Sequence, residues 1–136
     1  MEIKLDNVLA YLTPKSQVAF LISNYTIRQA LEKMKFHRYT SVPVIDKFGK
    51  YVGTITEGDL LWYMVDNKKF KTEDLESVRL SDIPRTRDNF AVNANTKLES
   101  LVDAAISQNF IPIVDDQNIF IGIVTRKSVI AYLTKI

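Results

Sequence analysis

The 136-residue sequence contains no cysteine and a single histidine, His37. The missing cysteines exclude disulfide bonds, thiolate catalysis and cysteine-ligated zinc, and they favour a cytoplasmic location. One histidine cannot build a metal site with others, and neither a catalytic Ser or Cys motif nor a phosphate-binding glycine loop accompanies it. The sequence therefore predicts neither enzymatic activity nor a bound metal.

Long hydrophobic runs and a strong charge of one sign are also missing. The first residues, MEIKLDNVLAYL, include acidic side chains and lack the apolar region of a signal peptide. The run VAFLI at residues 18–22 is far too short to span a bilayer. A net charge of +2 creates no strong field for nucleic acid or a membrane surface. We therefore expect neither a membrane nor a nucleic acid as a partner.

What the sequence does contain is an internal repeat. The segment 42–56 matches the segment 111–125 without a gap, at an offset of 69 residues. Upstream the offset becomes 70, and all four prolines then fall in register. Chance does not place every proline in register, so we interpret the chain as a tandem duplication. The predicted domains are repeat 1 (residues 8–66), a polar linker (67–79) and repeat 2 (80–134).

Each repeat is predicted to fold in the order β-α-β-β-α, which places the chain in the α/β (α+β) class. Short strands at 19–23 and 90–93 precede helices that begin with a capping box, at Thr26-x-x-Gln29 and Thr96-x-x-Glu99. A hairpin follows, with Gly49 or Asn118 supplying a positive φ, and a second helix closes the repeat. A repeat of about 60 residues buries little core alone. We therefore expect the two sheets to pack about a pseudo-twofold axis, with two related clefts between the repeats.

The junction GTITEGD, which ends a strand and starts a helix, has two interpretations. Thr56 at the N-cap with Asp59 three residues later is a capping box. A carboxylate at this place is also suited to accept hydrogen bonds from two vicinal ribose hydroxyls. The interpretations are compatible, because Thr56 can cap the helix while Asp59 faces a cleft.

The second repeat departs from the first at this junction. Arg126 and Lys127 follow Thr125, and Ser128 stands where the first repeat has aspartate. Cations in a first helical turn oppose the helix dipole by about 0.3–1 kcal/mol each. A bound phosphate explains both cations, and ordinary solvated side chains are the alternative. With Ser128 in place of a carboxylate, the sequence predicts one well-formed nucleotide cleft and a weaker second one.

The segment KFHRYTS, residues 35–41, precedes the strand that contains Pro43. Its charged residues and His37 are interpreted as a solvated face. Tyr39 either fills the edge of the core or stacks on a flat base. Thr40 and Ser41 present hydroxyl and backbone groups to a base edge.

With these motifs in place, the sequence resembles the cystathionine-β-synthase (CBS) domain, and the whole chain resembles a stand-alone CBS pair. The matching residues are TSVPVIDKFGKYVGTITEGDLL and IPIVDDQNIFIGIVTRKSVI, and the resemblance covers residues 8–134. It implies a pseudo-symmetric module that forms a homodimer and binds adenosine-containing ligands such as AMP, ATP or cyclic di-AMP. HRYTSVPVID, together with the second repeat, also resembles small CBS proteins that bind cyclic di-AMP, with Arg-Lys in place of two arginines.

The resemblance also implies which residues contact the ligand. Ribose contacts are implied for Thr56 and Asp59, and phosphate contacts for Thr125, Arg126 and Lys127. Base contacts are implied for Ile22, Ser23, Tyr39, Thr40, Ser41, Val42 and Pro43. The second cleft is implied to use Val92, Asn93, Ile111, Pro112 and Ser128.

We therefore expect a regulatory sensor of adenine nucleotides, AMP or cyclic di-AMP, that has no catalysis of its own. Ligand binding is expected to shift a conformational or dimer equilibrium, which a partner protein reads. The alternative is an adaptor whose clefts stay empty and whose surface binds another protein. A nucleic-acid binder using the basic patches 35–38 and 68–71 is less favoured, because the net charge is small.

Overall fold

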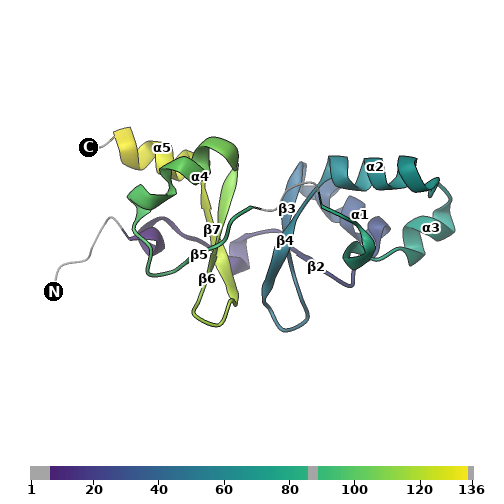
Figure 1. Ribbon diagram of the computed structural model, residues 1–136, viewed down its shortest axis with the longest axis horizontal. Helices are drawn as coiled ribbons and strands as arrows, with labels where there is room; N and C mark the ends of the chain where they lie inside the picture. Colours follow the sequence, from purple (N-terminus) through teal and green to yellow (C-terminus); the bar gives the residue numbers. More distant parts are fainter. Residues whose placement is uncertain (1–6, 86–88, 135–136) are drawn as a thin grey trace. The chain divides into compact units, whose positions relative to one another are not determined.

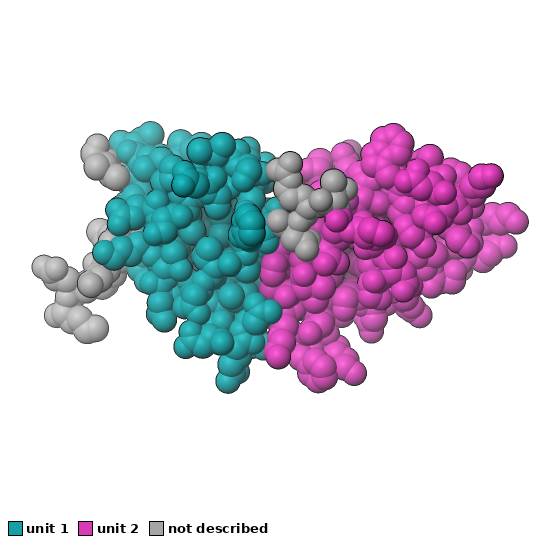
Figure 2. Space-filling model, viewed as in Figure 1, with its two compact units in different colours: residues 1–18, 89–136 teal, residues 19–88 magenta. Residues whose placement is uncertain are grey.

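The computed structural model describes residues 7–85 and 89–134. The start of the chain and residues 86–88 of the predicted repeat 2 lie outside the described residues. The chain divides into two compact units, one of residues 19–88 and one that combines residues 1–18 with 89–136 (Figure 2). Each unit is described by itself below.

The unit of residues 19–88 is a three-stranded sheet with its helices on one side (Figure 1). The strand order is β2-β3-β4, with β2 parallel and β4 antiparallel to β3. The elements are β2 (Leu21–Ile22), α1 (Ile27–His37), β3 (Ser41–Ile45), β4 (Tyr51–Thr56), α2 (Glu57–Asn67), α3 (Thr72–Ser77) and the 3-10 helix η3 (Leu80–Asp82).

The second unit contains a four-stranded sheet of order β1-β7-β6-β5. Strand β5 is parallel to β6, and β7 is antiparallel to β6. The order β-α-β-β-α is therefore confirmed in both units, although the first strand of each is shorter than expected. The elements are η1 (Val8–Tyr11), β1 (Thr13–Pro14), η2 (Lys15–Gln17), β5 (Val92–Asn93), η4 (Leu98–Leu101), α4 (Val102–Ser107), β6 (Phe110–Val114), β7 (Phe120–Thr125) and α5 (Arg126–Thr134).

The hydrophobic core of each unit contains a residue from the start of the other predicted repeat. Val8 is fully buried in the core of the second unit, where its N–H donates to Thr96 O at 3.0 Å. Leu80 is buried in the core of the other unit, where its N–H donates to Tyr25 O at 2.8 Å. The compact units therefore differ from contiguous halves of the sequence, while the repeat boundaries themselves stay a prediction.

Gly122 allows the N-terminal segment to join the second sheet. Strand β1 pairs with β7 at Pro14 and Gly122. A Cβ atom at Gly122 would lie 2.2 Å from the carbonyl oxygen of Thr13, which no side chain tolerates. Glycine at this position is thus required by the close approach of two backbones.

The two hairpins confirm the turn chemistry expected from the sequence. Gly49 and Asn118 adopt positive φ angles of 86° and 65°. An aspartate before each turn accepts hydrogen bonds from the backbone of the turn. In the first hairpin, Asp46 Oδ1 accepts from the N–H of Phe48 at 2.8 Å and from the N–H of Lys50 at 3.0 Å. Asp115 does the same in the second hairpin.

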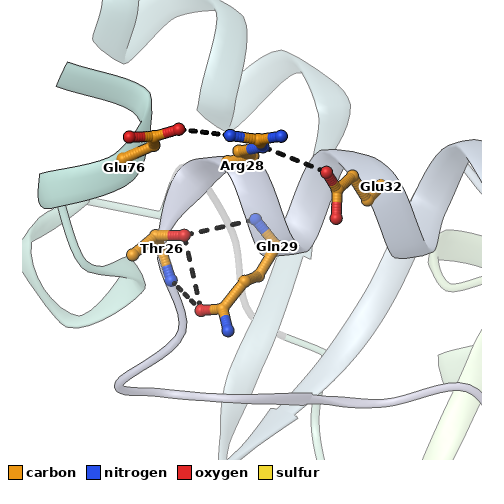
Figure 3. A network of polar contacts seen from close by, with 5 residues as sticks. All are labelled: Thr26, Arg28, Gln29, Glu32 and Glu76. Atoms are coloured by element: carbon orange, nitrogen blue, oxygen red, sulfur yellow. Dashed lines mark hydrogen bonds and ion pairs between the residues drawn. The ribbon is translucent and has the colours of Figure 1, made fainter. Parts of the chain in front are cut away.

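The capping box at the start of α1 is also confirmed (Figure 3). Thr26 Oγ1 accepts from the N–H of Gln29 at 3.2 Å, and Gln29 Oε1 accepts from the N–H of Thr26 at 2.8 Å. Arg28 extends this network by pairing with Glu32 in α1 and Glu76 in α3. Its hydrogen bonds to these two carboxylates raise the pKa of Arg28. Helix α3, at the end of the predicted linker, is thereby tied to α1.

The capping box predicted at Thr96 and Glu99 is wrong. The helical segment begins as 3-10 helix η4, its N-cap residue is Lys97, and no side chain caps it. Regular α-helix starts only at Val102. A Thr-x-x-Glu pattern is present in the sequence, but the helix begins one residue too late to use it.

The reason for this difference is the register between the repeats. Ser23 N–H bonds to Ile45 O in one unit, and Ala94 N–H bonds to Val114 O in the other, so the upstream offset is 71 and not 70. Lys97 therefore corresponds to the N-cap threonine of α1. Two residues are then missing from the second repeat between its helix and its next strand. The buried helical positions follow the same offset: Ile27, Ala30 and Met34 correspond to Leu98, Leu101 and Ala105.

No helix in the described part of the chain is long and apolar enough to cross a membrane.

Candidate functional site

The strand–helix junction between β4 and α2 holds a nearly buried carboxylate. Asp59 is 5% exposed, and its Oδ2 accepts from the N–H of Thr56 at 2.9 Å. Thr56 Oγ1 accepts in return from the N–H of Asp59 at 3.0 Å. The capping interpretation is thus confirmed, and such a cap contributes about 0.5–2 kcal/mol. The same bonds fix the carboxylate in one orientation at the positive end of the helix.

The segment before β3 lies at the same end of the sheet as this carboxylate. Ser41 pairs with Thr56 in the β3–β4 register, and the N–H of Glu57 donates to Thr40 O at 2.9 Å. Tyr39, the residue before Thr40, is 47% exposed. The fold therefore brings the predicted ribose residues and three of the predicted base residues to one end of one unit. Val42 and Pro43 continue from there into the buried strand.

Tyr39 does not fill the edge of the core, so that alternative is wrong. Its ring stacks on His37, with centroids 5.3 Å apart and planes inclined by 10°. The ring of His37 in turn meets the edge of Phe36, which is 82% exposed. A flat aromatic surface therefore stands in solvent beside the strand entrance.

Ile22 and Ser23 lie at the other end of the same sheet. Ile22 pairs with Ile45, which is four residues along β3 from Ser41. That separation is about 13 Å at the usual rise of a strand. Within this unit, the structure does not bring these two predicted base residues next to Asp59.

The corresponding junction in the second unit uses hydroxyls in place of a carboxylate. Thr125 Oγ1 accepts from the N–H of Ser128 at 3.2 Å and donates to Ser128 Oγ at 3.0 Å. Arg126 Nε donates to Ala105 O at 2.7 Å, near the C-terminal end of α4. A cation at the negative end of a helix is favourable, which gives Arg126 a structural role at its position. Lys127 is exposed.

The hydrogen bond from Arg126 Nε to Ala105 O does not use the two terminal nitrogens of the guanidinium. The guanidinium is partly buried, and within the described chain Nε is its only nitrogen with a hydrogen bond. The two terminal nitrogens form the fork that suits an anion. The contact with Ala105 therefore orients the side chain and leaves this fork unpaired.

The second repeat fills the position of Tyr39 with a buried amide. Gln108 is 3% exposed, its Oε1 accepts from the N–H of Phe90 at 3.0 Å, and its Nε2 donates to Phe110 O at 3.2 Å. Ile111 and Pro112 are buried in β6. Val92 and Asn93 pair at the opposite end of that strand, as their counterparts do in the first repeat.

The model of one protein family matches this chain twice. The CBS domain matches residues 11–66 and again residues 80–135. The chain is a CBS-domain protein. Because the two matches cover most of its length, the resemblance and the tandem fold expected from the sequence are both confirmed.

Solved structures of other CBS proteins share the fold of this CBS pair. One is CbpB in complex with cyclic di-AMP, which is 25% identical, has a TM-score of 0.85, and aligns over 96% of this chain and 86% of its own. Another is a CBS domain protein from Streptococcus pneumoniae TIGR4, 26% identical with a TM-score of 0.82, over 94% of this chain and 86% of its own.

A curated relative of the CBS pair is a much longer protein. Inosine-5'-monophosphate dehydrogenase from Methanocaldococcus jannaschii is 29% identical over 105 residues, which are 77% of this chain and 19% of the dehydrogenase. L-aspartate semialdehyde sulfurtransferase from the same organism is 27% identical and is likewise covered over 19% of its length. The CBS pair thus spans about a fifth of the curated relatives it matches.

Sequence analysis missed several neighbours of Asp59 in the CBS pair. Asp59 lies at the edge of a cavity of about 240 Å³. The helical residues among its neighbours follow Asp59 at intervals of three, four, seven and eight, so the helical period was a usable signal for them. Nothing in the sequence pointed to Pro84 and Arg85. The other lining residues are Trp62, Tyr63, Asp66, Asn67, Pro84 and Arg85.

Among residues 7–85 and 89–134, no three His, Asp or Glu side chains come together in a way that would hold a metal ion.

Proposed function

We propose that this CBS pair is a regulatory module that binds an adenine nucleotide at Asp59 and signals its presence to a partner protein. The observation that carries the proposal is the oriented, 5%-exposed carboxylate at the same end of the sheet as the exposed ring of Tyr39. Ribose hydroxyls donate to Asp59, the base lies against Tyr39 and the adjoining backbone of Thr40 and Ser41, and no bond in the nucleotide is broken. The likeness to CbpB, which binds cyclic di-AMP, supports this ligand class.

In the second unit, we propose Thr125, Arg126 and Lys127 as the residues that bind phosphate. Arg126 keeps a two-nitrogen fork unpaired within the described chain, and Lys127 is exposed beside it. Thr125 stands at the start of the same helix. A bidentate guanidinium contact favours phosphate over a neutral group.

We assign the principal site to the first repeat and only a weaker one to the second. Ser128 offers a hydroxyl that already bonds to Thr125, and Gln108 occupies the place of the exposed aromatic ring. The residues proposed for the second site, namely Val92, Asn93, Ile111, Pro112 and Ser128, therefore offer neither an acidic side chain nor a stacking surface.

A homodimer fits the exposed apolar residues of the closing helices. Leu61 and Trp62 in α2 are 48% and 59% exposed, and Ile130 and Leu133 in α5 are 53% and 42% exposed. Exposed apolar side chains on a helix favour association with another protein surface. The same observation favours the second candidate function, an adaptor that binds another protein and needs no nucleotide.

Isothermal calorimetry and thermal shift with AMP, ATP and cyclic di-AMP test the proposal. We expect at least one of them to bind and to raise the melting temperature. 2'-Deoxy-AMP is the matched control, because it lacks one of the two vicinal hydroxyls proposed to bind Asp59. In cyclic di-AMP the 3' oxygen is esterified, so its affinity depends on one hydroxyl per ribose. Absence of binding by all three nucleotides contradicts the proposal and leaves the adaptor.

A further inference from the structure

A second hollow, of about 320 Å³, lies beside the C-terminal end of α1. Its apolar part comes from Leu31 and Met34, and two cations and a carboxylate complete it. A volume at the low end of the range for ligand pockets suits a few side chains of another molecule. Its lining residues are Leu31, Met34, Lys35, Arg38, Tyr39, Thr40 and Glu57.

The two cations of this hollow have no protein partner in the described chain. Lys35 and Arg38 are exposed, and neither forms an ion pair or a side-chain hydrogen bond there. Arg38 has a left-handed backbone, with φ 60° and ψ 33°, because it ends α1. Its backbone N–H bonds to carbonyl oxygens of the last helical turn, which fixes where its side chain starts.

An exposed aromatic surface continues from the hollow. Phe36 is 82% exposed and meets the edge of His37, which stacks on Tyr39. Large aromatic side chains next to arginine are typical of protein interfaces. The apolar residues, the cations and the aromatic rings all come from residues 31–40.

The second repeat has a shorter segment where the first repeat forms this hollow. It has two residues fewer between its helix and its next strand, and the buried Gln108 stands in place of Tyr39. Its helix ends at Ser107 without a left-handed residue, because the following Gln108 is extended, at φ -123°. The segment that lines the hollow thus distinguishes the first repeat from the second, which favours a role in binding beyond the common fold.

We propose that this hollow is the docking site for a segment of a partner protein in which an acidic side chain stands next to an apolar one. The apolar side chain contacts Leu31 and Met34, and the carboxylate binds between Lys35 and Arg38. Both cations are unpaired within the described chain, so the carboxylate replaces no existing ion pair. Charge-assisted hydrogen bonds to arginine and lysine supply specificity for the acid.

The docking site adjoins the proposed nucleotide site through one short segment. Tyr39 and Thr40 line the hollow, and Thr40 O accepts from the N–H of Glu57, next to Thr56. A nucleotide that orders this segment changes the affinity for the partner, and the partner changes nucleotide affinity by the same factor. This linkage rests on the proposed function, whereas docking itself does not.

Selection of a random dodecapeptide library on the full chain, without nucleotide, tests the docking site. Enriched peptides should carry Asp or Glu within a few residues of Leu, Ile, Met or Phe. A synthetic peptide of that kind should bind roughly tenfold more weakly to the variant Lys35→Gln, Arg38→Asn. Asparagine keeps the left-handed conformation that Arg38 needs.

The matched control is the variant Lys47→Gln, Lys68→Asn. Lys68 also ends a helix in the left-handed region, with φ 53°, but it lies at the end of α2 and does not line the hollow. Circular dichroism should show equal melting of both variants, and the control should bind the peptide as the wild type does. Absence of enriched peptides, enrichment of basic ones, equal loss in the control, or binding of a single-stranded oligonucleotide in place of peptides overturns the proposal.

Asp59→Ala separates this proposal from the nucleotide proposal. It should keep the peptide affinity measured without nucleotide, because Asp59 does not line the hollow. Any effect of cyclic di-AMP or AMP on peptide affinity should disappear in it. Loss of peptide binding by this folded variant, in the absence of nucleotide, contradicts the docking site as placed here.

Discussion

The two strand–helix junctions of this CBS pair share a cap and differ in the group that the cap presents. In both, a threonine hydroxyl accepts from the backbone N–H three residues later, at 3.0 Å for Thr56 and 3.2 Å for Thr125. The third helical residue is a carboxylate in one repeat and a hydroxyl in the other. The two junctions therefore share the cap, and only the first repeat adds the charge of a carboxylate at this position.

The segments before β3 and β6 differ even more. The first repeat exposes Tyr39, whereas the second buries Gln108 with both ends of its amide bonded. A buried amide that is fully bonded stabilises the loop, whereas an exposed ring contributes little to the core. The segment before β6 thus contributes to the folded core of the second repeat, whereas the segment before β3 is exposed to solvent in the first.

The largest effect is expected where each core depends on the segment before the other repeat. Leu80→Ala should lower the free energy of unfolding by about 2–5 kcal/mol, because Leu80 is 2% exposed. Val8→Ala should cost less, since valine is smaller, although Val8 is fully buried. Urea unfolding monitored by circular dichroism measures both. Leu9→Ala is the control, because Leu9 is 50% exposed, and an equal effect there would contradict the exchange of segments between cores.

Converting one junction into the other tests their proposed difference in binding. Asp59→Ser should weaken AMP binding by roughly a hundredfold, because two charge-assisted hydrogen bonds are lost while serine still fits a helix start. Ser128→Ala should change the affinity by less than about threefold, because it removes no charged contact. Calorimetry measures both affinities. Equal small effects of the two variants would indicate that both junctions serve only as helix caps, with no ribose contact at Asp59.

The smallest effect is expected at Thr26 and Thr96, the two threonines whose sequence patterns both predicted a capping box. Thr26→Ala should cost about 1 kcal/mol of unfolding free energy, because it removes the observed cap of α1. Thr96→Ala should change stability by less than about 0.5 kcal/mol, since no side chain caps η4. Urea unfolding compares the two variants. A larger loss at Thr96 would contradict the register described here.

Local patterns predicted much of the fold and part of the candidate site. The hairpin turns with positive φ at Gly49 and Asn118 and the cap at Thr56 depend on bonds within five residues of the chain, and the apolar pattern marked the strands. The cavity beside Asp59 was not predicted, because two of its lining residues, Pro84 and Arg85, come from a segment distant in sequence. The ligand roles of the site residues stay predictions.

By itself, the sequence determined the duplicated β-α-β-β-α order, because its apolar pattern occurs twice, and the capped junction at Asp59, because residues three apart supply both bonds of the cap. Only the tertiary structure decided that Val8 belongs to the second core, that Lys97 is the N-cap of η4, and that Ile22 lies at the far end of β3 from Ser41. Those outcomes depend on strand register and on the two residues that one repeat lacks. Hydrogen bonds between distant segments set that register, and a pattern of three or four residues does not encode it.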